Sequence, residues 1–469
     1  MGIKNWWKNQ VTKYVEKKGW FPSMKTEKEY TLLNEFYLWY DGKSSHLSNY
    51  YANFSRDTVK GQYFWAVSFK NNIKKTHSGL PMAIVDTVTN VTGVPKITID
   101  KPYTERLMKI LKDNDFDNLI KQDQVPLTMV TGYGAFFPNY INGNIAIEFI
   151  DGRYIEIEKK GNVVTGVIKQ TKLDDKHTLL EKRTLNKIEY QLLKEDKQIQ
   201  LSSHPATKDL EDIIINVGMI PAVAVRFKAG TDTYGRSIFH GKVDLLDDFD
   251  QSWSQLSNNV RKSGAITYMP SSMVEVDKKT GYALEPDIFG ASHIMIRGTD
   301  AKIETVQPQI LSTELLETIN KQLIMILGGM LSPSSLGFEL QRTPNAEAQR
   351  EREKVTLVTR DDIIDNETQV IKNILDLALR FEDALNGKTI NEYDVQVAFA
   401  DYASPTFNER ANVLVPLLAA AGISIDKFVQ EVWAGDLEDE ELEEEINKIK
   451  EQRQVNVDEL YRTFTPGSE

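Results

Sequence analysis

The sequence predicts an α+β fold in which a small β insert interrupts a body of helices and sheets. Three observations support this fold class. Apolar residues recur at three- and four-residue steps in several long segments, which is the spacing of amphipathic helices. Between Ala135 and Arg226, alternating runs are separated by turn signals such as Asn142-Gly143, a pattern typical of antiparallel strands. A second β-rich stretch, 265–309, lies between two helical segments.

Length and composition narrow the class of protein. The chain has 469 residues, enough for about three domains of roughly 150 residues each. It carries 56 Lys and Arg against 68 Asp and Glu, and the net charge of −12 disfavours a strongly basic nucleic-acid binder. The absence of cysteine excludes disulfides, thiolate metal sites and cysteine nucleophiles. No signal peptide is expected, and the longest apolar run, Leu323–Met330, is too short to span a bilayer.

The N-terminal half begins with helical sequence. Residues 1–50 are rich in aromatic side chains and are expected to dock on the chain's own body or on another subunit. Helices are predicted over 69–94, ending at Gly93 and Pro95, and over 104–122. One antiparallel sheet is expected to follow and to end near Arg226.

The C-terminal half alternates helices with short β segments. A polar loop is predicted over 228–237, and three helices are predicted over 238–262, 312–330 and 345–386. The β insert between the first two helices is expected to contain a hairpin turn at 279–281, and a loop with two prolines covers 331–344. The remaining predictions are a strand over 394–400, helices over 408–421 and 425–433, and a solvated acidic segment over 436–454.

Signals for catalysis are thin. Gly328-Gly329 lacks the Lys-Ser/Thr of a nucleotide-binding loop. The carboxylate pairs Asp247-Asp248 and Asp361-Asp362 are expected to be solvating charges on exposed helices. The histidines are scattered and show no zinc-type spacing: His46, His77, His177, His204, His240 and His293. The sequence therefore predicts no catalytic residue, no metal ligand and no cofactor.

The order of elements carries more information than any motif. Two helices that flank a compact insert must lie near each other and run roughly antiparallel, because the insert joins both of them. The sequence thus predicts a stalk of two helices with a β tip.

The chain resembles a known protein family over roughly residues 50–450, and three segments carry this resemblance. They are Gly235-Arg-Ser237 before a helix that contains Leu246-Asp-Asp-Phe-Asp-Gln-Ser-Trp-Ser-Gln255, the loop Leu331-Ser-Pro-Ser-Ser-Leu-Gly-Phe338, and Thr343-Pro-Asn-Ala-Glu-Ala-Gln349 before the long helix. With the order of elements, they resemble the portal proteins of tailed phages that infect Gram-positive hosts.

The resemblance implies a division of the chain into named regions. By position, the wing comprises residues 1–237, including a helical N-terminal arm, and residues 345–400. The stem helices cover 238–263 and 310–330 and flank a clip at 264–309. A tunnel loop at 331–344 follows, and the crown is 401–469.

The resemblance also implies a function in a phage particle. Twelve copies form a ring at one vertex of the capsid, and double-stranded DNA passes through its channel during packaging, retention and ejection. The expected partners are the terminase, a head–tail adaptor, and capsid and scaffold proteins, with no membrane. The protein is expected in the virion after assembly in the host cytoplasm. An acidic subunit suits this function, since many cationic contacts would hold the DNA by counterion release.

Site residues follow from the same resemblance. Lys321 in the second stem helix and Arg342 in the tunnel loop are expected to approach DNA. The alternative is that these two side chains form salt bridges between subunits. The alternative for the tunnel loop is an ordinary connector between helices. The loop residues expected to face the channel are Ser334, Ser335, Leu336, Gly337, Phe338, Glu339, Leu340, Gln341 and Arg342. The clip residues expected to dock a partner are Met273, Glu275, Lys278, Lys279 and Tyr282.

Two other functions compete with this interpretation. The first is a non-portal capsid or head-assembly scaffold, which would share the acidic, cysteine-free and aromatic-rich composition. The second is a hydrolase that uses the carboxylate pairs at Asp247, Asp248, Asp361 and Asp362.

Overall fold

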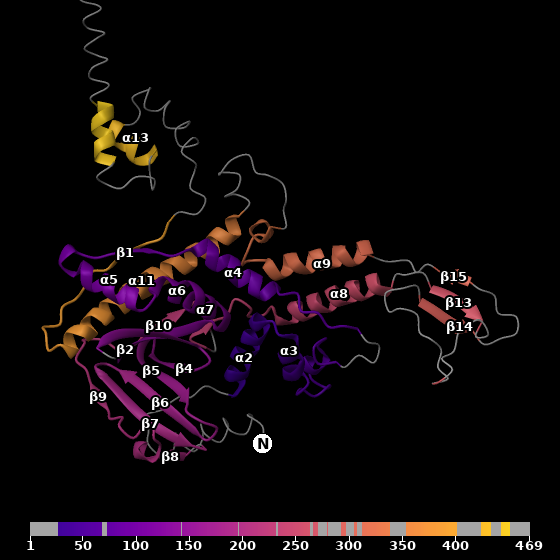
Figure 1. Ribbon diagram of the computed structural model, residues 1–469, viewed down its shortest axis with the longest axis horizontal. Helices are drawn as coiled ribbons and strands as arrows, with labels where there is room; N and C mark the ends of the chain where they lie inside the picture. Colours follow the sequence, from indigo (N-terminus) through magenta and orange to yellow (C-terminus); the bar gives the residue numbers. More distant parts are fainter. Residues whose placement is uncertain are drawn as a thin grey trace, which may run out of the picture. The chain divides into compact units, whose positions relative to one another are not determined.

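The computed structural model confirms an α+β fold, in which helices and mostly antiparallel sheets alternate along the chain (Figure 1). The chain forms two compact units, Met1–Leu340 with Glu353–Ala400, and Gln341–Arg352 with Asp401–Glu469. The structure describes residues 27–67, 73–141, 143–195, 197–230, 233–262, 266–270, 279, 292–296, 304–306, 312–337, 353–400, 424–432 and 442–450.

Two helices open the described chain, α2 (Glu27–Asp41) and α3 (Ser44–Tyr51). Phe36, Trp39 and Tyr51 are buried in the main hydrophobic core, so this part of the aromatic arm docks on the chain's own body. The Trp39 indole donates to the Tyr51 hydroxyl at 2.7 Å, and that hydroxyl donates to Glu35 at 2.7 Å. A short turn, η1 (Val59–Gln62), follows.

The helix expected over 69–94 is shorter in the structure. Helix α4 spans Leu80–Thr92 and ends at Gly93, whose positive φ of 73° closes it. Residues 73–79 form no regular secondary structure, and polar groups of Thr76, His77 and Ser78 bond to a helix far along the chain. Residues 68–72 lie outside the described part.

The single helix expected over 104–122 is broken into several pieces. The break lies at Asn114 and Asp115, where the Asn114 amide bonds to the backbone of Ile145 and Ile147 on a neighbouring strand. Asp115 takes a positive φ of 44°. The pieces are α5 (Thr104–Asp113), α6 (Phe116–Asn118), the π-helical turn η3 (Leu119–Gln124) and α7 (Val125–Thr131), preceded by η2 (Lys101–Tyr103).

The β-rich region forms two antiparallel sheets where one was expected. The first has the order β10-β2-β3, with β2 (Tyr133–Ile141), β3 (Asn144–Asp151) and β10 (Val223–Arg226). The second has the order β4-β5-β6-β7-β8, and β9 also pairs with β7. Its strands are β4 (Ile155–Lys160), β5 (Val163–Lys172), β6 (His177–Thr184), β7 (Lys187–Lys194), β8 (Lys197–Ile199) and β9 (Ile213–Ile214).

A buried arginine connects the two sheets. Arg183 of β6 is 1% exposed, and its guanidinium donates to the carbonyls of Pro138 at 2.8 Å and Pro221 at 2.7 Å. Pro138 belongs to β2 and Pro221 lies just before β10, so a strand of one sheet is bonded to the backbone of the other. These bonds satisfy a charge that would be costly to bury alone.

The long helix α11 (Lys354–Leu385) packs against α4 and the β10-β2-β3 sheet. Its apolar face is fully buried at Ile371, Ile374 and Leu375. After it, β16 (Gln396–Ala398) pairs with β1 (Lys96–Thr98), a strand that the sequence pattern did not indicate. The helix expected from residue 345 is described from Lys354 onward.

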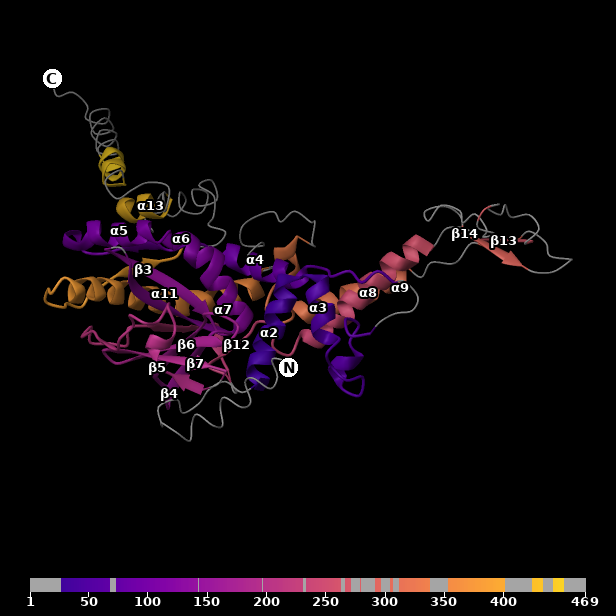
Figure 2. The same ribbon diagram turned by 60° about the horizontal axis from the view of Figure 1, so that its bottom comes forward.

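Two helices and three strands form the remaining part of the first unit. They are α8 (Val243–Lys262), β13 (Ile266–Pro270), β14 (Ser292–Ile296), β15 (Glu304–Val306) and α9 (Ser312–Leu327). Figures 1 and 2 both show the strands beyond the ends of α8 and α9. Strands β13 and β14 are parallel, so a hairpin turn at Lys279 does not join them.

Helix α8 begins five residues later than expected. Residues 238–242 form turns, because the Ser237 hydroxyl and carbonyl accept from the amides of Phe239 and His240. Gly241 has a φ of 73°. The loop before these turns contains the short pair β11 (Lys228–Ala229) and β12 (Gly235–Arg236).

The second unit contains two described helices. Helix α13 spans Ile425–Val432, and residues 442–450, within the expected acidic segment, are also helical. Lys450 forms an ion pair with Asp426 at 2.5 Å. The helix expected over 408–421 lies outside the described residues. Among the helices that the structure describes, none is long and apolar enough to cross a membrane.

Candidate functional site

The helix pair α8–α9 is antiparallel, as a single lysine demonstrates. Lys242, just before α8, donates from its ammonium to the carbonyls of Met325 at 2.8 Å and Gly328 at 3.3 Å. These carbonyls are at the C-terminal end of α9, where a cation is favoured. The beginning of α8 therefore lies beside the end of α9, and the two opposite ends both lead into the β13–β15 sheet.

An apolar seam holds the two helices together. Leu246 and Phe249 of α8 are buried, as are Ile319, Leu323 and Ile326 of α9. They recur at three- and four-residue steps, so each helix presents one apolar stripe to the other. This seam is the packing that the sequence spacing predicts.

A second face of α8 is polar yet buried, because it holds a segment of the chain that lies outside the helices and strands. We call this segment the strap (residues 63–67 and 73–78). The carboxylate of Asp250 accepts from the Trp65 indole at 3.2 Å and the Ser78 amide at 2.9 Å, and it contacts His77 Nδ1 at 2.6 Å. The Ser254 hydroxyl accepts from the Thr76 amide at 3.0 Å. The strap fixes α8 to the body.

Asp247 belongs to the same polar face and is not the solvating charge that the sequence suggested. It is 4% exposed, and it accepts from the amides of Phe64 at 2.7 Å and Trp65 at 3.4 Å. Burial raises the pKa of Asp247 to about 7, against the effect of these two amides. Its neighbour Asp248 is exposed.

The second carboxylate pair is exposed, and each of its members has a cationic partner. Asp361 lies 3.4 Å from Arg360, and Asp362 lies 3.3 Å from Lys228. Asp247, in contrast, faces the strap. Three of the four carboxylates that the hydrolase hypothesis combines are thus engaged in separate contacts, and the fourth, Asp248, is exposed.

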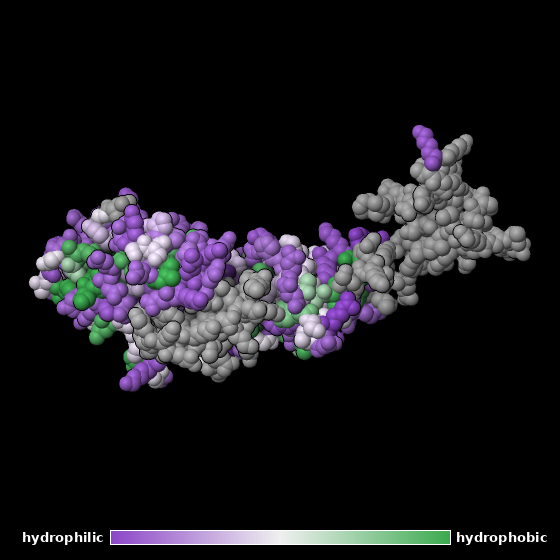
Figure 3. Space-filling model, turned by 90° about the horizontal axis from the view of Figure 1, so that it is seen from below, coloured by the Kyte–Doolittle hydropathy of each residue, from purple (hydrophilic) through white to green (hydrophobic). Residues whose placement is uncertain are grey.

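The outer surface of the helix pair retains large apolar side chains. On α9 these are Leu316, Ile324 and Met325, and Ile324 is 59% exposed. On α8 they are Trp253, 41% exposed, and Val260. The face drawn in Figure 3 is mostly hydrophilic with scattered hydrophobic areas.

The first half of the predicted tunnel loop is attached to α11. Residues 333–336 form the turn η6 (Pro333–Leu336), and the Ser332 amide donates to the Thr356 hydroxyl at 2.9 Å. The Ser335 and Thr356 hydroxyls bond at 2.7 Å. Ser334, Ser335 and Leu336 are half-buried, and Gly337 is exposed with a φ of 77°. The five other predicted loop residues lie outside the described part: Phe338, Glu339, Leu340, Gln341 and Arg342.

The predicted stem and clip residues are placed as follows. Lys321 projects from α9 with its side chain 77% exposed, and its ammonium lies 3.8 Å from Glu317 one turn earlier. Lys279 is exposed in a turn. The four other predicted docking residues lie outside the described part: Met273, Glu275, Lys278 and Tyr282. DNA contact by Lys321 and partner docking by the clip residues stay predictions.

A basic hollow at the base of the helix pair was not anticipated from the sequence. Lys228, Arg236, His240 and Lys242 line it beside Gly328. Two of these cations already have partners within the chain. Lys228 forms an ion pair with Asp362, and Lys242 donates to a carbonyl at the C-terminal end of α9. The four residues are close in sequence, but only the fold brings them to one surface.

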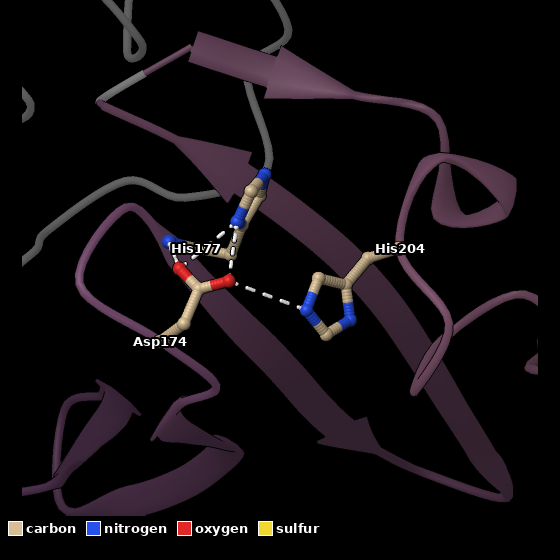
Figure 4. A group of neighbouring side chains, drawn as sticks. All are labelled: Asp174, His177 and His204. Carbon is tan, nitrogen blue, oxygen red and sulfur yellow. Dashed lines mark hydrogen bonds and ion pairs between the residues drawn. The ribbon is translucent and has the colours of Figure 1, made fainter.

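The structure also gathers two histidines that the sequence suggested were scattered. His177 and His204 face the carboxylate of Asp174 at the edge of the β4–β8 sheet (Figure 4). The sequence does place Asp174 three residues before His177 in a predicted turn between strands, and this spacing could have indicated that the two side chains meet. His204 comes from a separate segment, which spacing did not reveal.

Comparisons with known proteins give limited information. No protein-family model matches the chain, and no curated protein matches it. Among solved structures, the chain is similar to one from an assembly described as "Neck of native GTA particle computed with C12 symmetry". The two chains are 10% identical, with 76% of this chain and 90% of that chain covered and a TM-score of 0.42, a similarity too low to assign a family.

Proposed function

We propose that this chain is the subunit of a phage portal ring, with the α8–α9 pair facing a central DNA channel. The observation that carries the proposal is the antiparallel helix pair with a small sheet at its far end, established by the Lys242 contacts with Met325 and Gly328. The pair is fixed to the body on one side by the strap, which leaves its other surface for contacts with neighbouring copies.

Ring formation accounts for the exposed apolar side chains of the pair. Trp253, Leu316, Ile324 and Met325 have large exposed areas, and no partner for these areas exists within the described residues of one chain. Trp and Met are enriched in the cores of interfaces between subunits. We assign a second copy of the chain to this surface. A contact between different faces of identical copies closes into a ring when its rotation permits.

The charge of the outer face of α9 suits a channel that does not retain DNA. Glu314, Glu317 and Lys321 lie on the same side of α9 as Ile324 and Met325, so in the proposed ring they border both the subunit contact and the channel. Glu317 is near enough to Lys321 to offset its charge. Each phosphate that a protein neutralises steepens the slope of log K against log salt concentration by about 0.9 for duplex DNA, because counterions are released. A subunit with few unpaired cations on this face therefore lets the duplex slide.

The proposed role places the protein at a capsid vertex of the virion, after assembly in the host cytoplasm. The terminase, a head–tail adaptor, and capsid and scaffold proteins are the proposed partners, and the β13–β15 region is the proposed docking site. The chain itself is proposed to be a passive conduit without enzymatic activity, so the packaging motor must reside in a separate protein.

Electron microscopy and native mass spectrometry of the purified chain test the proposal. The expected result is a closed ring, of twelve copies in the proposal, with a channel wide enough for duplex DNA. The variant Ile324→Glu places a charge in the proposed contact and is expected to yield monomers. The matched control Val163→Glu changes an equally exposed apolar residue on β5, with 68% exposure, and is expected to keep the ring.

Two outcomes would contradict the proposal. A monomeric wild-type chain, or rings that persist unchanged in Ile324→Glu, would remove the proposed subunit contact. An extended lattice without a closed channel would favour the alternative of a capsid or head-assembly scaffold.

A further inference from the structure

We propose that Asp174, His177 and His204 bind one divalent transition-metal ion of the zinc class. The site lies within one chain at the edge of the β4–β8 sheet, so this inference does not depend on the proposed ring. The ligand atoms of the three side chains lie within 4.8 Å of one another. Figure 4 shows that the carboxylate points between the two imidazole rings.

Backbone bonds hold the carboxylate in place. Asp174 lies in the turn between β5 and β6, and its Oδ1 accepts from the amides of Lys176 at 2.7 Å and His177 at 2.8 Å. These amides hold the pKa of Asp174 well below its usual range, with a further contribution from His177. The carboxylate is therefore ionised at neutral pH, as a metal ligand must be.

The second carboxylate oxygen faces both rings. Asp174 Oδ2 lies 2.8 Å from His177 Nδ1 and 3.4 Å from His204 Nε2. Ligands at the zinc–nitrogen distance of about 2.0–2.1 Å in a tetrahedral site are separated by roughly 3.3 Å. The His204 separation matches that value and the His177 separation is about 0.5 Å shorter, so the His177 ring must move away from the carboxylate to admit an ion.

Separate elements position the two histidines. His177 is the first residue of β6, and His204 follows the short turn η4 (Leu201–Ser203). The Thr207 hydroxyl donates to the Leu201 carbonyl at 2.7 Å and closes the segment that carries His204. The side chains of His177 and His204 are 16% and 17% exposed, whereas Asp174 is 44% exposed. The site is thus walled by the rings and open to solvent beside the carboxylate.

The donor set indicates the class of metal. Two imidazole nitrogens and one carboxylate oxygen suit Zn²⁺, Co²⁺ or Ni²⁺, whereas Mg²⁺ and Ca²⁺ prefer oxygen ligands. The fourth position would be taken by water. The nearest charged neighbours are already paired, with Lys172 3.0 Å from Asp175 and Lys176 3.6 Å from Glu195.

One hydrogen bond must change when metal binds. His204 Nδ1 accepts from the Ala206 amide at 3.1 Å, which places the proton of the neutral, metal-free ring on Nε2. Metal binding at Nε2 transfers the ring proton to Nδ1, so the Ala206 amide must turn to solvent. This amide lies in an exposed segment, where water takes the place of the ring nitrogen. The change of tautomer is a signature of metal binding that a simple His–Asp ion pair would not produce.

Titration with Co²⁺ tests the site in the full-length, untagged chain. The expected result is one equivalent bound, with visible absorption of a four-coordinate ion that Zn²⁺ abolishes by displacement. His177→Ala and His204→Ala are each expected to weaken binding at least tenfold. His46→Ala is the matched control, because His46 also pairs with an aspartate, Asp41 at 3.1 Å, but no third ligand lies nearby among the residues that the structure describes.

Nitrogen NMR of the histidine rings gives the second measurement on the wild-type chain. Zinc is expected to move the His204 proton from Nε2 to Nδ1 and to raise the melting temperature of the protein. Equal Co²⁺ binding by the wild type and both histidine variants would overturn the proposal. An unchanged His204 tautomer in saturating zinc would overturn it too, and this outcome decides the matter even if a variant fails to fold.

Discussion

The buried carboxylate of Asp250 accepts a hydrogen bond from the indole of Trp65 at 3.2 Å, and the two residues are 185 positions apart in sequence. Asp250 is fully buried and Trp65 is 1% exposed. The contact fastens the strap to α8, and it makes the orientation of the helix pair depend on the N-terminal third of the chain.

Removal of the Asp250 carboxylate is expected to destabilise the fold strongly. Asp250→Ala leaves the Trp65 indole, the Ser78 amide and His77 without their acceptor, at a cost of about 3 kcal/mol in the free energy of unfolding. Urea denaturation measures this loss. Asp248→Ala, an exposed change two residues earlier, is expected to stay within about 0.5 kcal/mol. Similar losses in the two variants would show that the strap contact is not the cause.

Asp247 gives the stability a defined pH dependence. Its pKa is about 7 in the folded chain, above the ordinary value near 4, so the folded state retains a proton that the unfolded state has released between these values. Its contribution to stability is therefore greatest below about pH 4, declines as the pH rises to about 7 and is then constant. The decline is expected to be smaller in Asp247→Asn, where residue 247 does not titrate.

Denaturation of both proteins across this pH range measures the difference between them. The quantity to compare is the free energy of unfolding of the wild type minus that of Asp247→Asn at each pH. Burial also raises the pKa of Glu367 to about 7, and subtraction removes the contribution of Glu367 because it titrates in both proteins. Parallel curves for the wild type and Asp247→Asn would contradict the assignment to Asp247.

Thr356 is expected to control the start of the predicted tunnel loop. Thr356→Val keeps the shape of the side chain but removes the acceptor of the buried Ser332 amide and the partner of Ser335. An unpaired buried amide costs about 1–3 kcal/mol. In the proposed ring, assembly should persist while DNA packaging in an in vitro assay declines. Thr165→Val, an exposed change on β5, is the control, and packaging equal to that of the control would exclude a role for this attachment.

Lys321 is expected to matter for DNA and not for folding. Its pair with Glu317 is exposed, and such pairs contribute about 0.5 kcal/mol or less, so Lys321→Ala should leave the denaturation curve nearly unchanged. If Lys321 faces the duplex in the ring, removal of its ammonium from one phosphate reduces the salt slope of DNA binding by about 0.9. Titrations of duplex DNA at several salt concentrations measure this slope. An unchanged slope would show that Lys321 does not contact phosphate.

Sequence patterns predicted the elements that depend on local periodicity. The apolar steps of Leu246, Phe249, Ile319 and Leu323 predicted α8 and α9, and alternation with turn signals predicted β2 to β7. The loop before Gly337 followed from the chemistry of its prolines. These features are encoded within a few residues of chain, where the spacing of apolar groups and the limits on backbone torsion decide the structure.

The features that were missed depend on distant partners. The apolar spacing extended the predicted helix back through Ile73, yet Asp250 and Ser254 bond to Ser78 and Thr76 outside any helix. The helix at 104–122 is broken because Asn114 bonds to Ile145 and Ile147. The same applies to the candidate metal site, whose His204 is brought to Asp174 by a turn that no local pattern marks. Such contacts form only when separate segments meet.

Arg183 limits how the body can deform. Its guanidinium reaches from β6 to the Pro138 and Pro221 carbonyls and is almost completely shielded from water. Glu181 on the same strand neutralises its charge at 2.5 Å, but sliding of one sheet over the other would break its bonds to the two carbonyls and leave buried polar groups without partners. Mechanical load that reaches either sheet is therefore passed to the other, and the two layers respond as a single stiff block.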